Sequence, residues 1–297
     1  MSTAFIFPGQ GGQFIGQGCA WLETNPELKE ILTLADKVSG RPITRLCLEG
    51  PLDELSRTAN LQPAILAVSL MGLRLMKAQQ KPDFTCGHSL GEFGALCAAE
   101  VLDEKTALTL VSHRAVLMDE AARKNPGAML AVIGLTPEVL EGICELARNE
   151  GPVGLANFNT PDQIVISGSI RAISAAGKYV KMKNGHVIPL PLSGAFHSEL
   201  MTEAAEKFAT ELASLDFHPP VCRVAPNATG EPTVDPIEIK ARLLSQITSP
   251  VLWTKTIQNL ARAGVTDFLE VWPKPYLTNI VKKCLPQKAT FNVKAWA

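Results

Sequence analysis

The pattern of apolar and polar residues changes near residue 125. Before that point, the strand-like apolar runs 3–7 and 82–86 stand beside longer stretches with the 3.6-residue period of helices. The helical patterns cover residues 19–39, 62–79 and 104–124, with a turn-rich stretch at 49–60. This part of the chain therefore predicts a sheet covered by helices, which is an α/β arrangement.

Shorter elements follow, and their order is strand, helix, strand, strand, helix, strand. They are predicted at residues 128–133, 137–149, 152–157, 163–168, 170–182 and 186–192. This order is typical of a ferredoxin-like unit. We therefore expect a small α+β subdomain of residues 125–193 inserted into a larger α/β subdomain of residues 1–124 and 194–297. The larger subdomain would resume with elements at 198–213, 221–225, 236–247, 254–263 and 266–271.

Arg114 interrupts the apolar face of the helix predicted at 104–124. At 100° per residue, leucine, alanine, valine and methionine fill one arc, and Arg114 falls in its middle. A guanidinium keeps its charge, and burying it without a partner is very costly. The partner would be either a structural carboxylate or the carboxylate of a substrate gripped by the two-pronged guanidinium.

Composition and charge narrow the function classes. Of the 297 residues, 46% are hydrophobic and 19% charged, which is enough for a large core. The formal net charge of −1 gives no overall field for nucleic acid or an anionic membrane. Apolar runs such as 64–73 and 127–135 are too short to span a bilayer, and the N-terminal residues lack the basic region of a signal peptide.

The cysteines and histidines carry no metal or disulfide pattern. The seven cysteines include no C-x-x-C pair, and the five histidines show no zinc-binding spacing. We therefore expect a reduced, cytoplasmic protein with no metal site and no bound cofactor.

The stretch 87–91, Gly-His-Ser-Leu-Gly, matches the G-x-S-x-G pattern of a nucleophile elbow. In such an elbow the serine lies on a strained turn between a strand and a helix, and small flanking residues let the two approach closely. A strand-like run precedes the motif, and a small apolar, helix-like run follows it. The alternative is a capping box, in which Ser89 caps a helix and Glu92 reaches back to it. We favour the nucleophile, a role compatible with starting a helix.

A nucleophilic serine needs a base. The α/β-hydrolase order places the catalytic histidine late in the chain, but no histidine follows His218. His197 lies in a glycine-containing loop between a predicted strand and a predicted helix, where catalytic side chains are often presented. It is either this base or a histidine that makes a local hydrogen bond at a helix N-terminus.

The glycines at 9–12 follow the first predicted strand, as in a phosphate-binding loop. The G-x-G-x-x-G pattern would need glycine at position 14, which is Phe14, and no Gly-Lys-Ser/Thr follows. These glycines are expected to let the backbone approach something other than a phosphate.

Several motifs, taken in chain order, resemble the malonyl-CoA:acyl carrier protein transacylases. They are FPGQG at 7–11, GHSLGE at 87–92, Arg114, N-x-N-x-P-x-Q at 157–163, AFHSELM at 195–201 and Gln246 ahead of SPVLW. The resemblance covers nearly the whole chain. It implies an α/β-hydrolase-like large subdomain and a ferredoxin-like small one.

The resemblance also implies ping-pong transfer of a malonyl group from malonyl-CoA to the phosphopantetheine thiol of an acyl carrier protein, for polyketide or fatty-acid synthesis. Ser89 would attack the thioester with His197 as general base. A backbone carbonyl at Gln246 would orient the histidine in place of an acidic side chain. Backbone N–H groups of Gln10 and Leu90 would form the oxyanion hole, which gives the nearby glycines a purpose.

The acyl group and its pocket are also implied by the resemblance. Arg114 would hold the malonyl carboxylate, and Asn157, Asn159 and Gln163 would line the thioester pocket. Phe196 stands where enzymes of bacterial fatty-acid synthesis commonly have serine, and this resembles the stand-alone acyltransferases that serve polyketide synthases. Its ring is expected to crowd the malonyl C2 carbon and disfavour methylmalonyl.

Two other functions remain as alternatives. One is an acyl hydrolase that clears carrier proteins, and relatives of that kind tend to lose the arginine found here at 114. The other is a non-catalytic partner of a carrier protein, against which Ser89 and His197 argue. The expected partners are malonyl-CoA and an acyl carrier protein, without nucleic acid or membrane, and we expect a monomer.

Overall fold

The computed structural model describes residues 2–286 and 289–295. Its larger sheet has five strands in the order β7-β2-β1-β8-β9, and all neighbouring pairs are parallel. The strands are β1 Ser2–Phe7, β2 Phe84–Gly87, β7 Arg223–Val224, β8 Val265–Glu270 and β9 Asn292–Ala295. Phe5 and Phe7 of β1 enter one hydrophobic core, whereas Ala4 and Ile6 enter another on the opposite face. Both faces of the sheet are therefore buried, as parallel sheets require.

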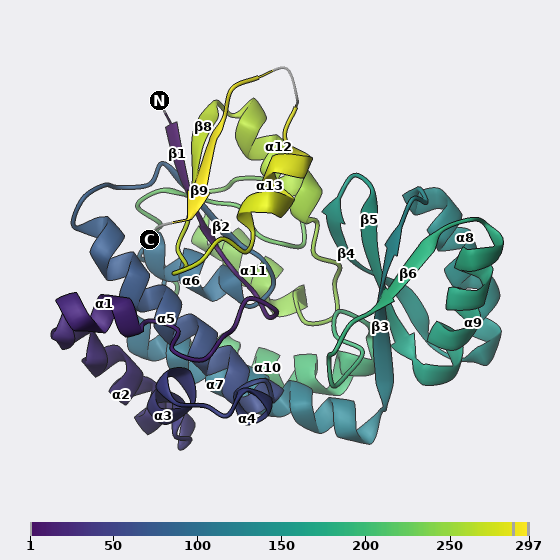
Figure 1. Cartoon of the computed structure of the whole chain (residues 1–297), viewed down its shortest axis with the longest axis horizontal. Helices are drawn as coiled ribbons and strands as arrows, with labels where there is room; N and C mark the ends of the chain where they lie inside the picture. The colour runs from purple at the N-terminus through teal and green to yellow at the C-terminus, as the bar shows by residue number, and fades with distance from the viewer. Residues whose placement is uncertain (1, 287–288, 296–297) are drawn as a thin grey trace.

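Helices cover these two faces. Figure 1 shows α2, α5 and α7 on one side of the sheet and α12 and α13 on the other, in agreement with the two cores. The helices of this part are α1 Cys19–Thr24, α2 Lys29–Ser39, α3 Ile43–Leu48, α4 Leu52–Leu55, α5 Thr58–Lys77, α6 Gly91–Ala98, α7 Glu104–Lys124, α10 Thr202–Ala213, α11 Pro236–Ser245, α12 Trp253–Arg262 and α13 Thr278–Cys284.

Helix α5 is longer than the apolar run 64–73 within it, and it passes through the core. By length and composition it could span a membrane, but 89% of its apolar 18-residue stretch is buried inside the protein. Its neighbours there include the helices α2, α6 and α7. Helix α5 is therefore a core helix, and its lack of a polar face follows from this position.

The second sheet is antiparallel, with the strand order β4-β5-β3-β6. Its strands are β3 Gly127–Ile133, β4 Val153–Thr160, β5 Gln163–Ser169 and β6 His186–Pro189, and its helices are α8 Pro137–Ala147 and α9 Ile170–Met182. The helices pack together against the sheet through a separate core, on the outer side of the molecule in Figure 1. The predicted α/β fold with a small antiparallel subdomain is confirmed.

Several predicted boundaries were wrong. The helix expected at 19–39 breaks after Thr24, where Pro26 begins a short 3-10 turn, because proline cannot continue a helix. The strand expected at 221–225 shrinks to β7, an edge strand of two residues. Helix α5 begins inside the stretch expected to form turns, and α3, α13 and β9 were not predicted at all.

Main-chain hydrogen bonds join the small sheet to the large subdomain at Val251, a residue outside both sheets that lies just before α12. The Phe158 N–H donates to the Val251 carbonyl at 2.9 Å, and the Val251 N–H donates to the Ala156 carbonyl at 2.8 Å. Strand β4 therefore contacts the segment that leads into α12. We propose the division into residues 1–124 with 194–297 and residues 125–193, and the candidate site lies along the junction between them.

Candidate active site

Ser89 lies on a tight turn between β2 and α6. Its φ angle is 50°, in the left-handed region that costs a non-glycine residue energy. The flanking glycines permit this turn. A Cβ atom at Gly87 would lie 2.0 Å from Gly91 carbonyl atoms, and one at Gly91 would lie 2.2 Å from the Phe7 carbonyl oxygen. The strand–turn–helix context expected of a nucleophile elbow is present.

The capping-box interpretation of Ser89 and Glu92 was wrong. Helix α6 begins at Gly91, and no side chain caps it. The Ser89 N–H donates to Asn227 Oδ1 at 2.6 Å rather than to Glu92. The Glu92 carboxylate instead accepts from the Asn227 N–H and from Gln246 Nε2. The Ser89 hydroxyl is therefore free of any capping role.

His197 lies beside the Ser89 hydroxyl, with 2.7 Å between Nε2 and Oγ. Its Nδ1 faces two backbone carbonyls, those of Gln246 at 3.0 Å and Ser249 at 3.1 Å. Because carbonyls only accept hydrogen bonds, Nδ1 carries the proton, and the Nε2 lone pair accepts from Ser89. His197 also has a positive φ angle of 57°. The predicted carbonyl of Gln246 is thus in place, and that of Ser249 joins it.

Burial controls the basicity of this histidine. The side chain is buried, which lowers the pKa of His197 from 6.5 to about 3, and the nearby positive charge of Arg114 lowers it further in the same direction. The imidazole is therefore neutral across the physiological range. In this form it can accept a proton from Ser89 without first losing one of its own.

Arg114 is 1% exposed and reaches the same place from α7. Its Nη1 donates to Gln62 Oε1 at 2.7 Å, and its Nη2 donates to Gln246 Oε1 at 3.0 Å and lies 3.4 Å from Ser89 Oγ. Among residues 2–286 and 289–295, no carboxylate lies within 4.0 Å of the guanidinium, and its Nε has no hydrogen-bond acceptor. No structural carboxylate therefore pairs directly with Arg114, whose side-chain acceptors are neutral, although the Glu92 carboxyl lies near enough for its charge to act on the guanidinium.

Both predicted oxyanion residues lie near the elbow, since Leu90 follows Ser89 in the chain and Gln10 lines the same cavity as Ser89. Within the part of the chain that the structure describes, the N–H groups of Gln10 and Leu90 donate to no protein acceptor. The loop that carries Gln10 packs closely on the elbow, since a Cβ at Gly9 would lie 2.6 Å from the His88 carbonyl oxygen. The Gln10 carbonyl accepts from the Tyr276 hydroxyl at 2.9 Å. Gly9 thus allows this loop to pack closely on the elbow.

A cavity of about 400 Å³ opens in front of Ser89, between the two sheets. Its walls include the predicted residues Gln10, Asn157, Asn159, Gln163, Phe196 and His197, together with apolar side chains such as Met118, Met129 and Val165. Leu90, Arg114 and Gln246 lie behind this lining. Asn159 bridges the two parts of the chain, because it contacts His88 Nε2 at 2.8 Å and donates to Gln163 at 3.1 Å.

Sequence reasoning missed Gln62, Asn227 and Tyr276. Gln62 is a fully buried amide in the otherwise apolar helix α5, and an isolated polar residue in such a run was the available signal. Asn227 holds the elbow, since its Nδ2 donates to the Gly87 carbonyl at 2.7 Å while its Oδ1 accepts from Ser89. It stands in a short polar loop that is typical of a turn, so the sequence offered no sign of this contact.

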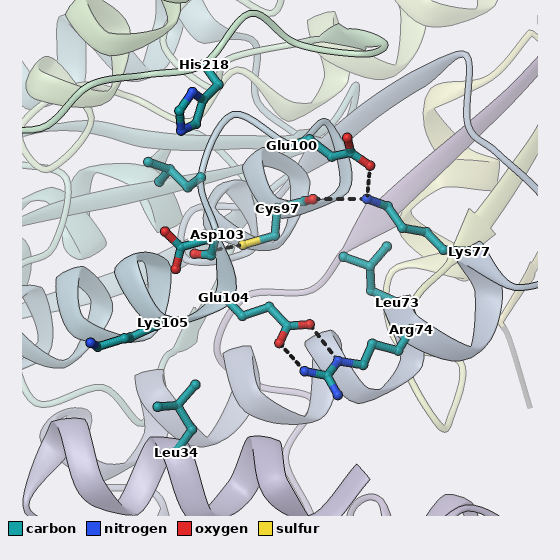
Figure 2. Close-up of a pocket in the computed structure, with 11 residues that line it drawn as sticks. Leu34, Leu73, Arg74, Lys77, Cys97, Glu100, Asp103, Glu104, Lys105 and His218 are labelled. Atoms are coloured by element: carbon teal, nitrogen blue, oxygen red, sulfur yellow. Dashed lines mark hydrogen bonds and ion pairs between the residues drawn. The ribbon is translucent and has the colours of Figure 1, made fainter. Parts of the chain in front are cut away.

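A second cavity, of about 560 Å³, is lined by side chains of α2, α5, α6 and α7, and many of these side chains are charged. Figure 2 shows its charged side chains pairing with one another: Arg74 faces Glu104, and Lys77 faces Glu100. Burial raises the pKa of the Cys97 thiol in its wall, which makes this thiol a poor nucleophile. The cavity beside Ser89 is therefore the candidate active site.

Known proteins resemble the chain over its whole length. The sequence model of the acyl transferase domain matches residues 4–297. A malonyl CoA-acyl carrier protein transacylase of Bacillus subtilis (strain 168) is 41% identical, over 94% of this chain and 89% of its own length. A malonyl-transacylase solved with its type II polyketide acyl-carrier protein superposes with a TM-score of 0.94 at 33% identity, covering 100% of this chain and 96% of that one. An acyl carrier protein S-malonyltransferase of Vibrio cholerae gives 0.93 at 35% identity, covering 100% and 97%.

Proposed function

The chain belongs to the malonyl-CoA:acyl carrier protein transacylase family, and from this premise we propose a ping-pong mechanism in which Ser89 carries the acyl group. The activity is transfer of a malonyl group from malonyl-CoA to an acyl carrier protein. The observation that carries the mechanism is the 2.7 Å contact between Ser89 Oγ and the unprotonated Nε2 of His197. A serine so close to a neutral imidazole can give up its proton as it attacks.

In the first half-reaction, Ser89 attacks the thioester carbonyl while its proton moves to His197. The negative charge that develops on the carbonyl oxygen is received by the N–H groups of Gln10 and Leu90. The tetrahedral intermediate then expels the coenzyme A thiolate, which takes the proton from His197. A malonyl ester of Ser89 remains.

In the second half-reaction, the phosphopantetheine thiol of the carrier protein replaces coenzyme A. It gives its proton to His197 and attacks the ester, and the proton returns to Ser89 as the new thioester leaves. The malonyl thioesters of coenzyme A and of the carrier protein are nearly equal in free energy. The enzyme must therefore protect the Ser89 ester from hydrolysis until the carrier-protein thiol arrives. The apolar walls of the cavity help to keep water from it.

Arg114 holds the carboxylate of the malonyl group in this proposal. Its guanidinium now donates to the amide oxygens of Gln62 and Gln246, which are weaker acceptors than a carboxylate. A malonyl carboxylate would supply the missing negative charge, whereas an acetyl group would supply nothing. Asn157, Asn159 and Gln163 would contact the thioester arm from the wall of the small sheet.

Initial-rate kinetics test the ping-pong proposal. Malonyl-CoA is varied at several fixed concentrations of phosphopantetheinylated carrier protein, and transfer is followed by the mass of the carrier protein. Parallel lines in the double-reciprocal plot are expected, because the first product leaves before the second substrate binds. Intersecting lines would mean that malonyl-CoA and the carrier protein bind to the enzyme together and that no free acyl-enzyme forms.

The rate of acylation by malonyl-CoA is expected to have no acid limb near pH 6.5. A general base must be neutral, and the lowered pKa of His197 keeps it neutral as the pH falls. The single-turnover rate should therefore stay level down to about pH 5. In the variant Arg114→Met one of the causes of the lowered pKa is removed, so any acid limb should move to higher pH. A wild-type midpoint near 6.5, with the fold intact by circular dichroism, would contradict the assignment.

We further propose that the chain serves polyketide or fatty-acid synthesis as a monomeric cytoplasmic enzyme, with Phe196 restricting the acyl group. Phe196 is buried in the cavity wall next to His197. In Phe196→Ser the ratio of methylmalonyl to malonyl transfer, measured in competition, should rise roughly 10-fold, since one methyl group in an apolar pocket has an effect of that size. An unchanged ratio would show that the ring does not limit the space at C2.

A further inference from the structure

Glu92 is a buried carboxyl group for which the proposed mechanism has no use. It lies in the first turn of α6 and is 1% exposed. One oxygen, Oε2, accepts from the Asn227 N–H at 3.1 Å and from Gln246 Nε2 at 2.8 Å. The other, Oε1, has no hydrogen-bond partner among the residues that the structure describes. A buried acid with this arrangement is costly, and it stands three residues after the nucleophile.

The Gln246 amide lies between the Glu92 Oε2 atom, which accepts a hydrogen bond from it, and the Arg114 guanidinium, which can only donate one. Its Nε2 donates to Glu92 and to the Ser89 carbonyl at 3.0 Å, while its Oε1 accepts from Arg114 at 3.0 Å. If the amide were turned over, its NH₂ group would face the guanidinium, which has no acceptor. Glu92 and the Ser89 carbonyl together therefore hold this amide in the orientation that suits Arg114.

Glu92 also supports the nucleophile, through its contact with Asn227. The Asn227 side chain spans the strained turn, accepting from the Ser89 N–H and donating to the Gly87 carbonyl. Its backbone N–H is fixed by Glu92 Oε2. One carboxyl oxygen thus holds the contact that keeps the elbow in place and the amide that contacts the arginine.

We infer that Glu92 is a positioning residue, whose Oε2 atom holds Gln246 and Asn227 in the orientations that the reacting groups need. The inference rests on the proposed function of the site. It concerns the acceptor atom rather than the negative charge of Glu92.

Protonation of Glu92 leaves this role intact. Burial raises the pKa of Glu92 to about 7, and the facing charge of Arg114 on α7 acts in the opposite direction. Cys86 on β2 also faces it, as a thiol whose pKa burial raises. A proton would sit on Oε1, which has no partner in the described chain, so Oε2 accepts in both states.

The test compares Glu92→Met, which removes the acceptor, with Glu92→Gln, which keeps an oxygen in that place. The exposed Glu145→Met on α8 is the matched control. Single-turnover acylation is measured with malonyl-CoA and with acetyl-CoA. We expect Glu92→Met to slow malonyl transfer about 10- to 100-fold and to reduce the preference for malonyl over acetyl, while Glu92→Gln stays within about threefold of wild type. A merely structural role would lower the melting temperature without changing the preference of the folded enzyme.

Two outcomes would overturn the inference. If Glu92→Gln is as impaired as Glu92→Met, the charge is what matters. If Glu92→Met keeps the wild-type rate and preference, the residue positions nothing. Should Glu92→Met fail to fold, Gln246→Met removes the amide but keeps the carbonyl that His197 uses, and it must show the same loss of preference. A wild-type enzyme that forms no malonyl ester would defeat the proposed function itself, a result distinct from all of these.

Discussion

Replacing Ser89 by alanine is expected to lower malonyl transfer by about 10⁴- to 10⁶-fold, down to what binding and the oxyanion donors alone provide. Without Oγ the malonyl group cannot form an ester with the enzyme, and His197 has no serine proton to accept. Of the described residues that line the cavity, Ser56 and Tyr276 also carry a hydroxyl, and their hydrogen bonds are to Gln13 and to the Gln10 carbonyl rather than to a base. Binding of malonyl-CoA should persist, because Arg114 and the cavity walls remain.

The experiment measures the mass of the carrier protein over time with malonyl-CoA and each enzyme variant. The control is Ser214→Ala, an exposed serine at the end of α10 that bonds its own helix. It should keep the wild-type rate. Transfer by Ser89→Ala within about tenfold of wild type would remove the serine from the mechanism.

Replacing Arg114 by methionine is expected to remove most of the enzyme's preference for malonyl-CoA over acetyl-CoA. Malonyl-CoA should lose about 100- to 1,000-fold in kcat/KM, because a charge-assisted, two-pronged contact in a buried site contributes about 3–4 kcal/mol. Acetyl-CoA makes no such contact, so its rate should hold or rise once the unpaired guanidinium is gone. Arg114→Lys should fall between, since it keeps the charge but loses the fork.

The control for this variant is Arg123→Met, on the same helix but 71% exposed and paired with Asp119. Competition between malonyl-CoA and acetyl-CoA measures the preference directly and cancels any difference in the active fraction. A malonyl preference that survives in Arg114→Met would show that another group of the enzyme binds the malonyl carboxylate.

The site was predictable where chemistry and backbone geometry impose local patterns. Gly87 and Gly91 are required by contacts shorter than any Cβ could tolerate, so G-x-S-x-G could be identified from residues alone. Arg114 could be found because helix α7 is regular enough for its faces to be laid out. The order of strands and helices in the small subdomain could also be predicted, because each element has its own local pattern of apolar residues.

The remaining contacts depend on residues distant in sequence. A capping role for Glu92 was the alternative that the sequence offered because the spacing S-x-x-E is local, whereas its partners Asn227 and Gln246 are brought to it only by the tertiary fold. Strand β9 is a short edge strand whose pairing with β8 leaves little pattern in its own residues. Helix α1 ended early because a single proline outweighs an otherwise continuous periodicity.

The most direct test of the acyl-enzyme mechanism is the intact mass of the protein after mixing with malonyl-CoA. The mass is recorded again after adding either phosphopantetheinylated carrier protein or buffer alone, with Ser89→Ala as the blank. The mechanism predicts a malonyl adduct that persists in buffer, leaves rapidly to the carrier protein and never forms on Ser89→Ala. An adduct lost equally fast in buffer would mean an acyl hydrolase, and no adduct with malonyl-CoA intact would contradict the role given to Ser89.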